Sequence, residues 1–144
     1  FKNLTKKNKK FNRVRNMHFN KAKNIYKKTD LSDIKNHDNV KLVKKVVQEL
    51  IRSMNIVSEN INTKNYQIKN KHFSKSLVLI YTLQTSLDFE KAEKFCAHLF
   101  QIYEFCRKKL IDGMTKRTTE EINKAIFWLE EIFFGNVRAE NRGK

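Results

Sequence analysis

Residues 89–112 read FEKAEKFCAHLFQIYEFCRKKLID, and the spacing of their apolar side chains decides the fold. These side chains recur at alternating steps of four and three, which places them on one face of an α-helix. The pattern predicts a helix over 89–112, with Asp88 as its N-cap and Gly113 as the residue that ends it. The apolar row consists of Ala92, Cys96, Leu99, Tyr103, Cys106 and Leu110.

Three further segments, at 40–61, 66–87 and 119–134, also repeat apolar residues at helical spacing. Asn65 is expected to cap the second of these helices, and Gly135 to end the last. The connection that leads into the helix at 89–112 would be only one or two residues long. Long helices joined by short loops pack antiparallel to their neighbours. The sequence therefore predicts an all-α fold, an antiparallel up-down four-helix bundle.

The bulk composition fits a single helical domain. The chain has 144 residues, of which 40% are hydrophobic, with no proline and three glycines. Turn-rich β-sandwiches need more proline and glycine than this, and phosphate-binding loops need more glycine. The longest apolar run, 77–81, is far shorter than the ~20 residues that cross a bilayer, so no membrane insertion is expected. Cys96 and Cys106 would lie about 15 Å apart along one helix, too far for a disulfide, and free thiols fit a cytoplasmic protein.

Positive charge is concentrated at the N-terminus. The net charge is +16, and residues 1–29 hold eleven lysines and arginines and no acid. We expect 1–22 to form a basic, poorly ordered tail, 23–137 the four-helix bundle, and 138–144 a disordered C-terminal tail. A basic tail attracts nucleic acid, so a basic helical nucleic-acid-binding protein is the alternative function. It is the weaker hypothesis, because lysine dominates the tail and arginine is the better reader of bases.

The sequence contains no recognisable catalytic or metal-binding constellation. His18, His37, His72 and His98 do not form a two-histidine metal pair at helical spacing. Adjacent acids in the segment 119–134 flank an apolar row, and such acids usually form the solvated face of a helix. We therefore predict that the protein is not an enzyme and has no catalytic, cofactor-binding or metal-binding residues.

The chain has more large apolar side chains than a bundle of this size can bury. About three positions per heptad of each helix face the core. Some of them must lie in grooves or on the surface, which on a small soluble bundle mark a partner site, unless the N-terminal tail or residues 25–36 fold back and cover them. The side chains that cannot all face inward together are Phe89, Phe95, Phe100, Ile102, Tyr103 and Phe105 in one segment, and Phe127, Trp128 and Phe134 in the last.

Residues 99–110 carry the most specific family resemblance. They read LxxIYEFxRKKL, where x is any residue. The string resembles the Leu-x-x-Leu-Tyr-Asp-Tyr core, followed by two basic residues and Leu, of the FliS family of flagellin chaperones. Residues 73–91 resemble the second helix of that family and its following turn, and 118–134 resemble its final helix.

The resemblance implies a cytoplasmic chaperone of flagellar type III export. Such a chaperone binds the disordered C-terminal segment of flagellin in apolar grooves, prevents premature polymerisation and assists delivery to the flagellar export gate. Ile25 and Tyr26 lie where the family has a tyrosine implicated in contact with the gate; the alternative is a simple cap on the bundle. The flagellin-binding groove would be lined by Leu79, Tyr81, Phe95, Ile102, Phe105, Phe127 and Phe134, for each of which a place in the core is the alternative.

Overall fold

The computed structural model describes residues 37–142 of the chain, with side chains from 40 to 135. The predicted tail at 1–22 therefore lies outside the described residues. Within the described range the chain forms α2 (His37–Glu59), α3 (Tyr66–Thr85), α4 (Glu93–Lys116) and α5 (Thr119–Arg142).

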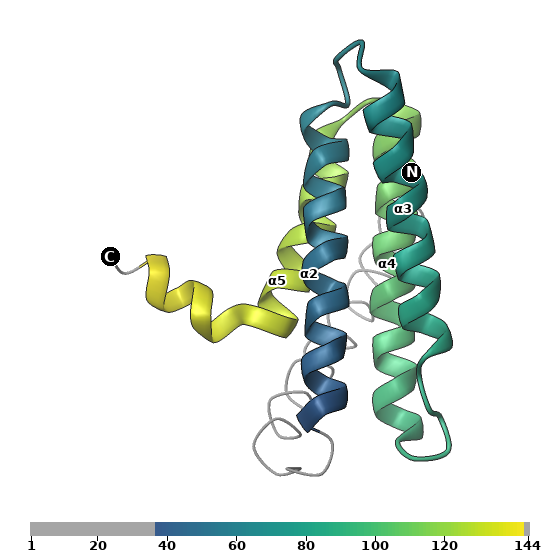
Figure 1. The fold of residues 1–144 in the computed structure, drawn as a ribbon, viewed down its shortest axis with the longest axis vertical. Helices are drawn as coiled ribbons and strands as arrows, with labels where there is room; N and C mark the ends of the chain where they lie inside the picture. The colour runs from purple at the N-terminus through teal and green to yellow at the C-terminus, as the bar shows by residue number, and fades with distance from the viewer. Residues whose placement is uncertain (1–36, 143–144) are drawn as a thin grey trace, which may run out of the picture.

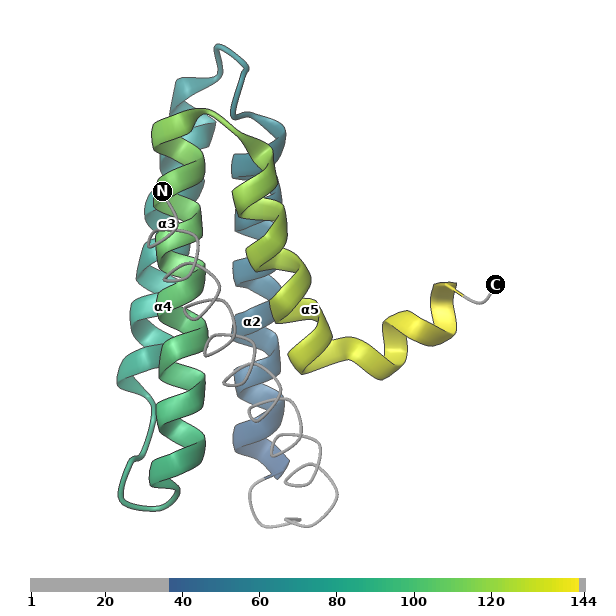
Figure 2. The same ribbon diagram turned by 180° about the vertical axis from the view of Figure 1, so that it is seen from behind.

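The helices run alternately up and down in two layers. In Figure 1, α2 and α3 form the front layer, and Figure 2 shows α4 and α5 from the opposite side. α2 and α4 each pack against both α3 and α5, so the four helices enclose one core. The antiparallel four-helix bundle predicted from the sequence is confirmed.

Each helix contributes one apolar row to the core. Five of the six residues whose spacing predicted α4 are buried, and Tyr103 is the largest of them. The sixth, Ala92, is exposed because it precedes the first turn of the helix. The core residues of the other helices are Val47, Leu50, Met54 and Val57 of α2, Ile80 and Leu83 of α3, and Ile122, Ala125, Leu129 and Phe133 of α5.

The prediction that Gly113 ends the third long helix is wrong. α4 continues to Lys116, and Arg117 takes the left-handed conformation with φ 54°, its N–H bonding the Gly113 carbonyl. Gly113 is buried inside the helix. A Cβ built on it would lie 2.7 Å from Cδ1 of Ile122 and 3.0 Å from the carbonyl oxygen of Thr118. Glycine is needed there because α4 and the start of α5 approach closely.

The prediction that Asp88 caps the same helix directly is also wrong. α4 begins at Glu93, and its N-cap position is Ala92, which makes no side-chain capping bond. The Asp88 carboxylate instead accepts the Glu90 N–H at 3.2 Å, and its carbonyl accepts the N–H of Lys91 at 3.3 Å. These local bonds hold a turn, so the connection runs over residues 86–92 rather than one or two residues.

The last helix bends where the sequence predicted its end. Phe134 has non-helical angles, φ −136° and ψ 15°, one residue before Gly135. The helix then resumes to Arg142, and this outer part turns away from the bundle (Figures 1 and 2). The domain boundary expected at 137 therefore falls within α5.

Both cysteines are buried and free, so the prediction that they do not pair is confirmed. The Cys96 thiol donates to the Asp88 carbonyl at 3.3 Å, and Cys106 lies 4.0 Å from the Ala125 carbonyl. Burial raises the pKa of both thiols, which keeps them protonated and unreactive.

Candidate partner-binding surface

Seven large apolar side chains are exposed on the described bundle. Four of them lie on α3, and one each on α2, on the α3–α4 connection and on α5. Single exposed apolar residues are ordinary, so what matters is which of the seven lie together. The set is Leu42, Tyr66, Ile68, Val78, Tyr81, Phe89 and Phe127.

Tyr81 is the most exposed of these residues, with 67% of its surface accessible. It precedes Gln84 by three residues, and Gln84 Nε2 donates to Glu104 Oε1 of α4 at 2.8 Å. Residues three apart share a side of a helix, so Tyr81 lies on the side of α3 that faces α4. The prediction that Tyr81 is available at the surface agrees with this position.

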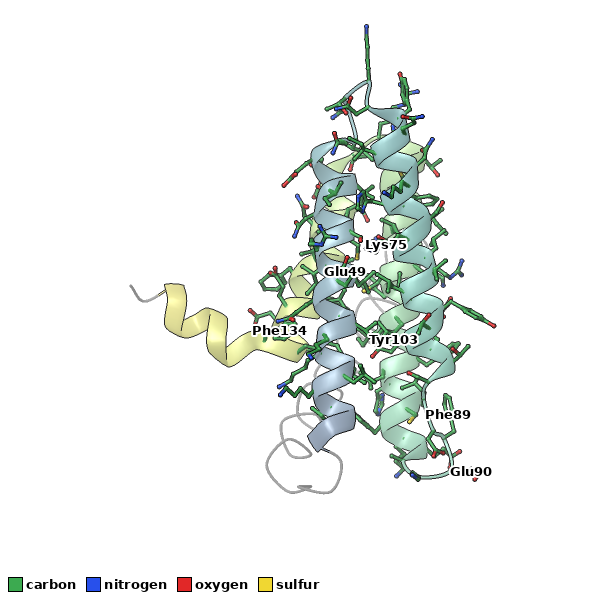
Figure 3. The ribbon with its side chains drawn as sticks, in the orientation of Figure 1. Glu49, Lys75, Phe89, Glu90, Tyr103 and Phe134 are labelled. Carbon is green, nitrogen blue, oxygen red and sulfur yellow. The ribbon has the colours of Figure 1, made fainter. Side chains whose placement is uncertain are left out.

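Phe127 and Phe134 lie in line on α5, seven residues apart. Phe127 follows Asn123 by four residues, and Asn123 accepts a hydrogen bond from Ser58 of α2 at 2.9 Å. Both aromatic rings therefore belong to the side of α5 that faces α2. Phe127 is 43% exposed, whereas Phe134 is half-buried beside the bend (Figure 3).

Leu79 and Phe95 are half-buried and pack against the core. Leu79 follows Lys75 by four residues, and Lys75 pairs with Glu49 of α2. Leu79 therefore lies on the α2 side of α3, across the helix from Tyr81. The residues expected to line one groove are thus distributed over several sides of the bundle.

Ile102 and Phe105 lie in the core rather than on a groove surface. Their exposed fractions are 1% and 7%. The Phe105 ring stacks on Trp128 of α5, with ring centroids 4.3 Å apart. The structure corrects the expectation that these two side chains line an open groove, because Ile102 belongs to the buried core and Trp128 stacks on Phe105.

Sequence reasoning did not single out Leu42 or Val78 as surface residues, whereas Phe89 was among the side chains of which some were expected in grooves or on the surface. Phe89 lies on the α3–α4 connection, where its ring makes an edge contact with Phe100 at 6.5 Å (Figure 3). A signal for Val78 was available, since the apolar residues of α3 lie around the whole helix and cannot all be buried.

Charged side chains tie each helix to the next between the apolar areas. Glu49 of α2 pairs with Lys75 of α3, and Lys109 of α4 pairs with Glu121 of α5. Hydrogen bonds from Arg52 and Lys75 lower the pKa of Glu49 to about 2. The hydrogen bond from Lys109 likewise lowers the pKa of Glu121. Both carboxylates stay ionised at neutral pH and hold adjacent helices in register.

A third polar link joins α3 and α4. Glu104 accepts hydrogen bonds from Arg107 on its own helix and from Gln84 on α3. These bonds lower the pKa of Glu104, with the Arg107 bond as the larger cause. These hydrogen bonds therefore fix α3 against α4 at the surface that carries Tyr81.

The described residues contain no group of three or more His, Cys, Asp or Glu side chains able to hold a metal ion. No helix among them is long and apolar enough to cross a membrane. Ile25 and Tyr26, expected to contact the export gate or cap the bundle, lie outside the described residues.

Comparison with models of known protein families shows which family the sequence belongs to. The model described as flagellar protein FliS matches residues 20–135. The match covers most of the chain and ends at the bend in α5. Neither the curated proteins nor the solved structures give a significant match. The chain belongs to the FliS family of flagellar chaperones.

Proposed function

We propose that this protein is an export chaperone for flagellin. It binds the C-terminal disordered segment of flagellin, which folds into amphipathic helices on the apolar surfaces of the bundle. Binding prevents premature polymerisation in the cytoplasm and assists delivery to the flagellar export gate. Family membership supports a flagellar chaperone in general, and the choice of client and of binding surface is the proposal.

The observation that carries the proposal is the exposure of Tyr81 and Phe127 on a bundle held by fixed polar links. A disordered segment loses conformational entropy when it folds on a partner. Burial of apolar surface, at about 25 cal/mol per Å², offsets that loss without a cofactor. Aromatic side chains supply much of this energy at interfaces because they are large and lose few rotamers.

The two aromatic areas lie on different helix pairs. Tyr81 is on the α4 side of α3, and the row of Phe127 and Phe134 is on the α2 side of α5. A single short helix contacts only one of these areas, so the client segment must be long enough to reach both. Leu79 and Phe95, half-buried at the edge of the core, are proposed to contribute when the client displaces neighbouring side chains. Ile25 and Tyr26 are proposed to contact the export gate.

The test mixes the protein with the C-terminal segment of a flagellin and measures heat by calorimetry and helix content by circular dichroism. We expect saturable heat together with a gain of helix. The double variant Tyr81→Ser/Phe127→Ser should bind at least about tenfold more weakly, because two aromatic contacts are lost. Leu42→Ser is the matched control, since Leu42 is also a largely exposed apolar residue but lies on α2 rather than on α3 or α5. Absence of both heat and helix gain would remove the flagellin proposal.

A salt series separates this function from nucleic-acid binding. Binding of an apolar client should change little between low and moderate salt. Binding to nucleic acid would weaken by powers of ten over the same range, because it releases counterions. A duplex or single-stranded oligonucleotide that binds more tightly than the flagellin segment would favour the alternative.

A further inference from the structure

α3 differs from the other helices in its outer surface. Four of the seven exposed large apolar residues belong to it. It carries three lysines and no acidic residue, whereas α2, α4 and α5 all contain both signs of charge. A helix that is apolar on its outer side and uniformly basic is unusual for a solvent-facing position.

α2 and α3 lie side by side at the front of the bundle (Figure 1), and the spacing of their residues arranges the side chains in ridges. Residues seven apart lie in line along a helix. Leu42 is therefore in line with Glu49 on α2, and Ile68 is in line with Lys75 on α3. The ion pair between Glu49 and Lys75 joins these two ridges at the centre (Figure 3).

A second pair of ridges lies beside the first, on the side of each helix that faces away from the core. Lys45 and Arg52 are in line on α2, and Lys71 and Val78 are in line on α3. We call the eight residues of these four ridges the α2–α3 face. Leu42 and Val78 are 61% and 62% exposed, and Ile68 is 46% exposed. The α2–α3 face comprises Leu42, Lys45, Glu49, Arg52, Ile68, Lys71, Lys75 and Val78.

The charge of the α2–α3 face is one-sided. It contains four cations and one carboxylate, a net charge of 4 − 1 = +3. Glu49 already binds both Arg52, at 2.8 Å, and Lys75. Lys45 and Lys71 form no ion pair with any carboxylate among the residues that the structure describes. The face therefore presents unmatched positive charge beside exposed apolar side chains.

The back of the bundle provides the contrast. On α4 and α5, Lys109 pairs with Glu121, and Lys124 pairs with both Glu120 and Glu121. Arg107 pairs with Glu104. These three cations are matched by carboxylates of the protein itself, whereas Lys94 and Lys108 of α4 form no ion pair among the described residues. The α2–α3 face is therefore distinguished by the combination of unmatched positive charge with the exposed Leu42, Ile68 and Val78.

We propose that the α2–α3 face binds an acidic amphipathic helix of a second partner protein, one other than the flagellin segment. From Leu42 to the level of Ile68 the face is about 21 Å long, which matches about 14 residues of helix at 1.5 Å each. The occupant places apolar residues on Leu42, Ile68 and Val78. Its carboxylates lie against Lys45, Lys71 and the outer side of Arg52.

A helix suits this face better than an anionic membrane does. The apolar side chains stand at separate points along the face, with the Glu49 carboxylate between them. A helix can match that order of apolar and charged positions residue by residue. A bilayer interior would have to receive the ionised Glu49 together with the apolar residues, which is unfavourable.

The test uses a labelled 18-residue peptide that has leucine at i, i+3, i+4 and i+7 spacing and glutamate at the flanking positions. A second peptide keeps the leucines and replaces glutamate with lysine. Fluorescence anisotropy against the full chain should show binding of the acidic peptide only. The variant Lys45→Glu/Lys71→Glu should weaken this binding by at least about tenfold. Leu42→Ser/Val78→Ser should also weaken it.

Lys94→Glu/Lys108→Glu is the matched control, because it reverses two exposed lysines of α4. It should leave acidic-peptide binding within about twofold of the unaltered chain. Equal losses for both charge-reversal variants would mean that net charge alone attracts the peptide, and would overturn the proposal. No binding of the acidic peptide, or binding of vesicles with one quarter anionic phospholipid in its place, would overturn it too.

A competition experiment separates this proposal from the flagellin-binding function. The flagellin C-terminal segment should bind Lys45→Glu/Lys71→Glu as it binds the unaltered chain, and should not displace the acidic peptide. Displacement would assign the α2–α3 face to the client and would overturn the second partner. Failure of the flagellin segment to bind at all would count against the proposed function and leave the peptide result standing.

Discussion

Gly113 lies where α4 and the start of α5 approach each other closely. An added methyl group would lie 2.7 Å from Ile122 Cδ1 and 3.0 Å from the Thr118 carbonyl, and both distances are too short for ordinary contact. We expect Gly113→Ala to lower the free energy of unfolding by about 1–3 kcal/mol, despite the better helix propensity of alanine. Urea denaturation followed by circular dichroism measures the change.

Gly135→Ala is the control for this substitution, since the nearest atom to its new methyl group, Glu131 Oε2, would be 3.7 Å away. It should leave the free energy of unfolding within about 0.5 kcal/mol of the unaltered chain. Comparable losses from both substitutions would show that glycine is needed for backbone freedom rather than for close approach.

Glu49 links stability to acid pH. Its pKa in the folded state is about 2, against an ordinary value of 4.5. A lowered carboxyl pKa contributes stability above pH 4.5, and this contribution is lost as the pH falls toward 2. We expect Glu49→Gln to be less stable than the unaltered chain at pH 7 and equal to it near pH 2. The difference should be small and should shrink in 1 M salt, because the pair is solvent-exposed.

His72 adds a second titration to the contact between α2 and α3. Its Nδ1 lies 3.5 Å from Ser53 Oγ of α2. Burial lowers its pKa below the ordinary 6.5, and the charges of Lys71, Lys75 and Arg52 lower it further. The unfolded chain then binds a proton more readily than the folded one, so stability falls as the pH drops through and below 6.5. His72→Gln should remove this step from the pH profile of the unfolding midpoint. Retention of the step would assign it to another group.

At the scale of whole helices, apolar spacing predicted each element but not its ends. The row through Cys96, Tyr103 and Leu110 is fixed by burial, which a sequence displays as periodicity. Helix ends depend on what lies beside them. A glycine at position 113 predicts the end of a helix, yet Gly113 is helical because Ile122 packs on it. The residue that takes the left-handed conformation is Arg117. The bend at Phe134 likewise has no local signal except the glycine that follows it.

At the scale of the whole molecule, the sequence predicted the surplus of aromatic residues but could not assign each one to core or surface. Phe105 and Phe127 both lie beside an apolar row. Phe105 is covered because Trp128 of the neighbouring helix stacks on it, whereas Phe127, on the α2 side of α5, remains 43% exposed. That distinction depends on how the helices rotate against each other, which spacing within one helix does not determine.

The outer part of α5 should be dispensable for the stability of the bundle. Beyond Phe134 the helix turns away from the other three (Figure 2). A chain that stops after Gly135 should retain its free energy of unfolding within about 0.5 kcal/mol, because the outer part of the helix turns away from the other three helices. A loss of more than about 2 kcal/mol in urea denaturation would mean that the outer part supports the fold.

The departure of α5 at Phe134 also divides the molecule into regions of unequal resistance to local opening. Below that point, within the part of the chain that the structure describes, α2, α3 and α4 alone surround the interior (Figure 1). Backbone amides there should exchange with deuterium through small fluctuations, while those around Leu110 should require cooperative unfolding. Exchange measured by mass spectrometry should therefore give protection that rises along α4 from Phe95 toward Leu110. Equal protection along α4 would contradict this prediction, because the amides of its first turns would then resist exchange as strongly as those near Leu110.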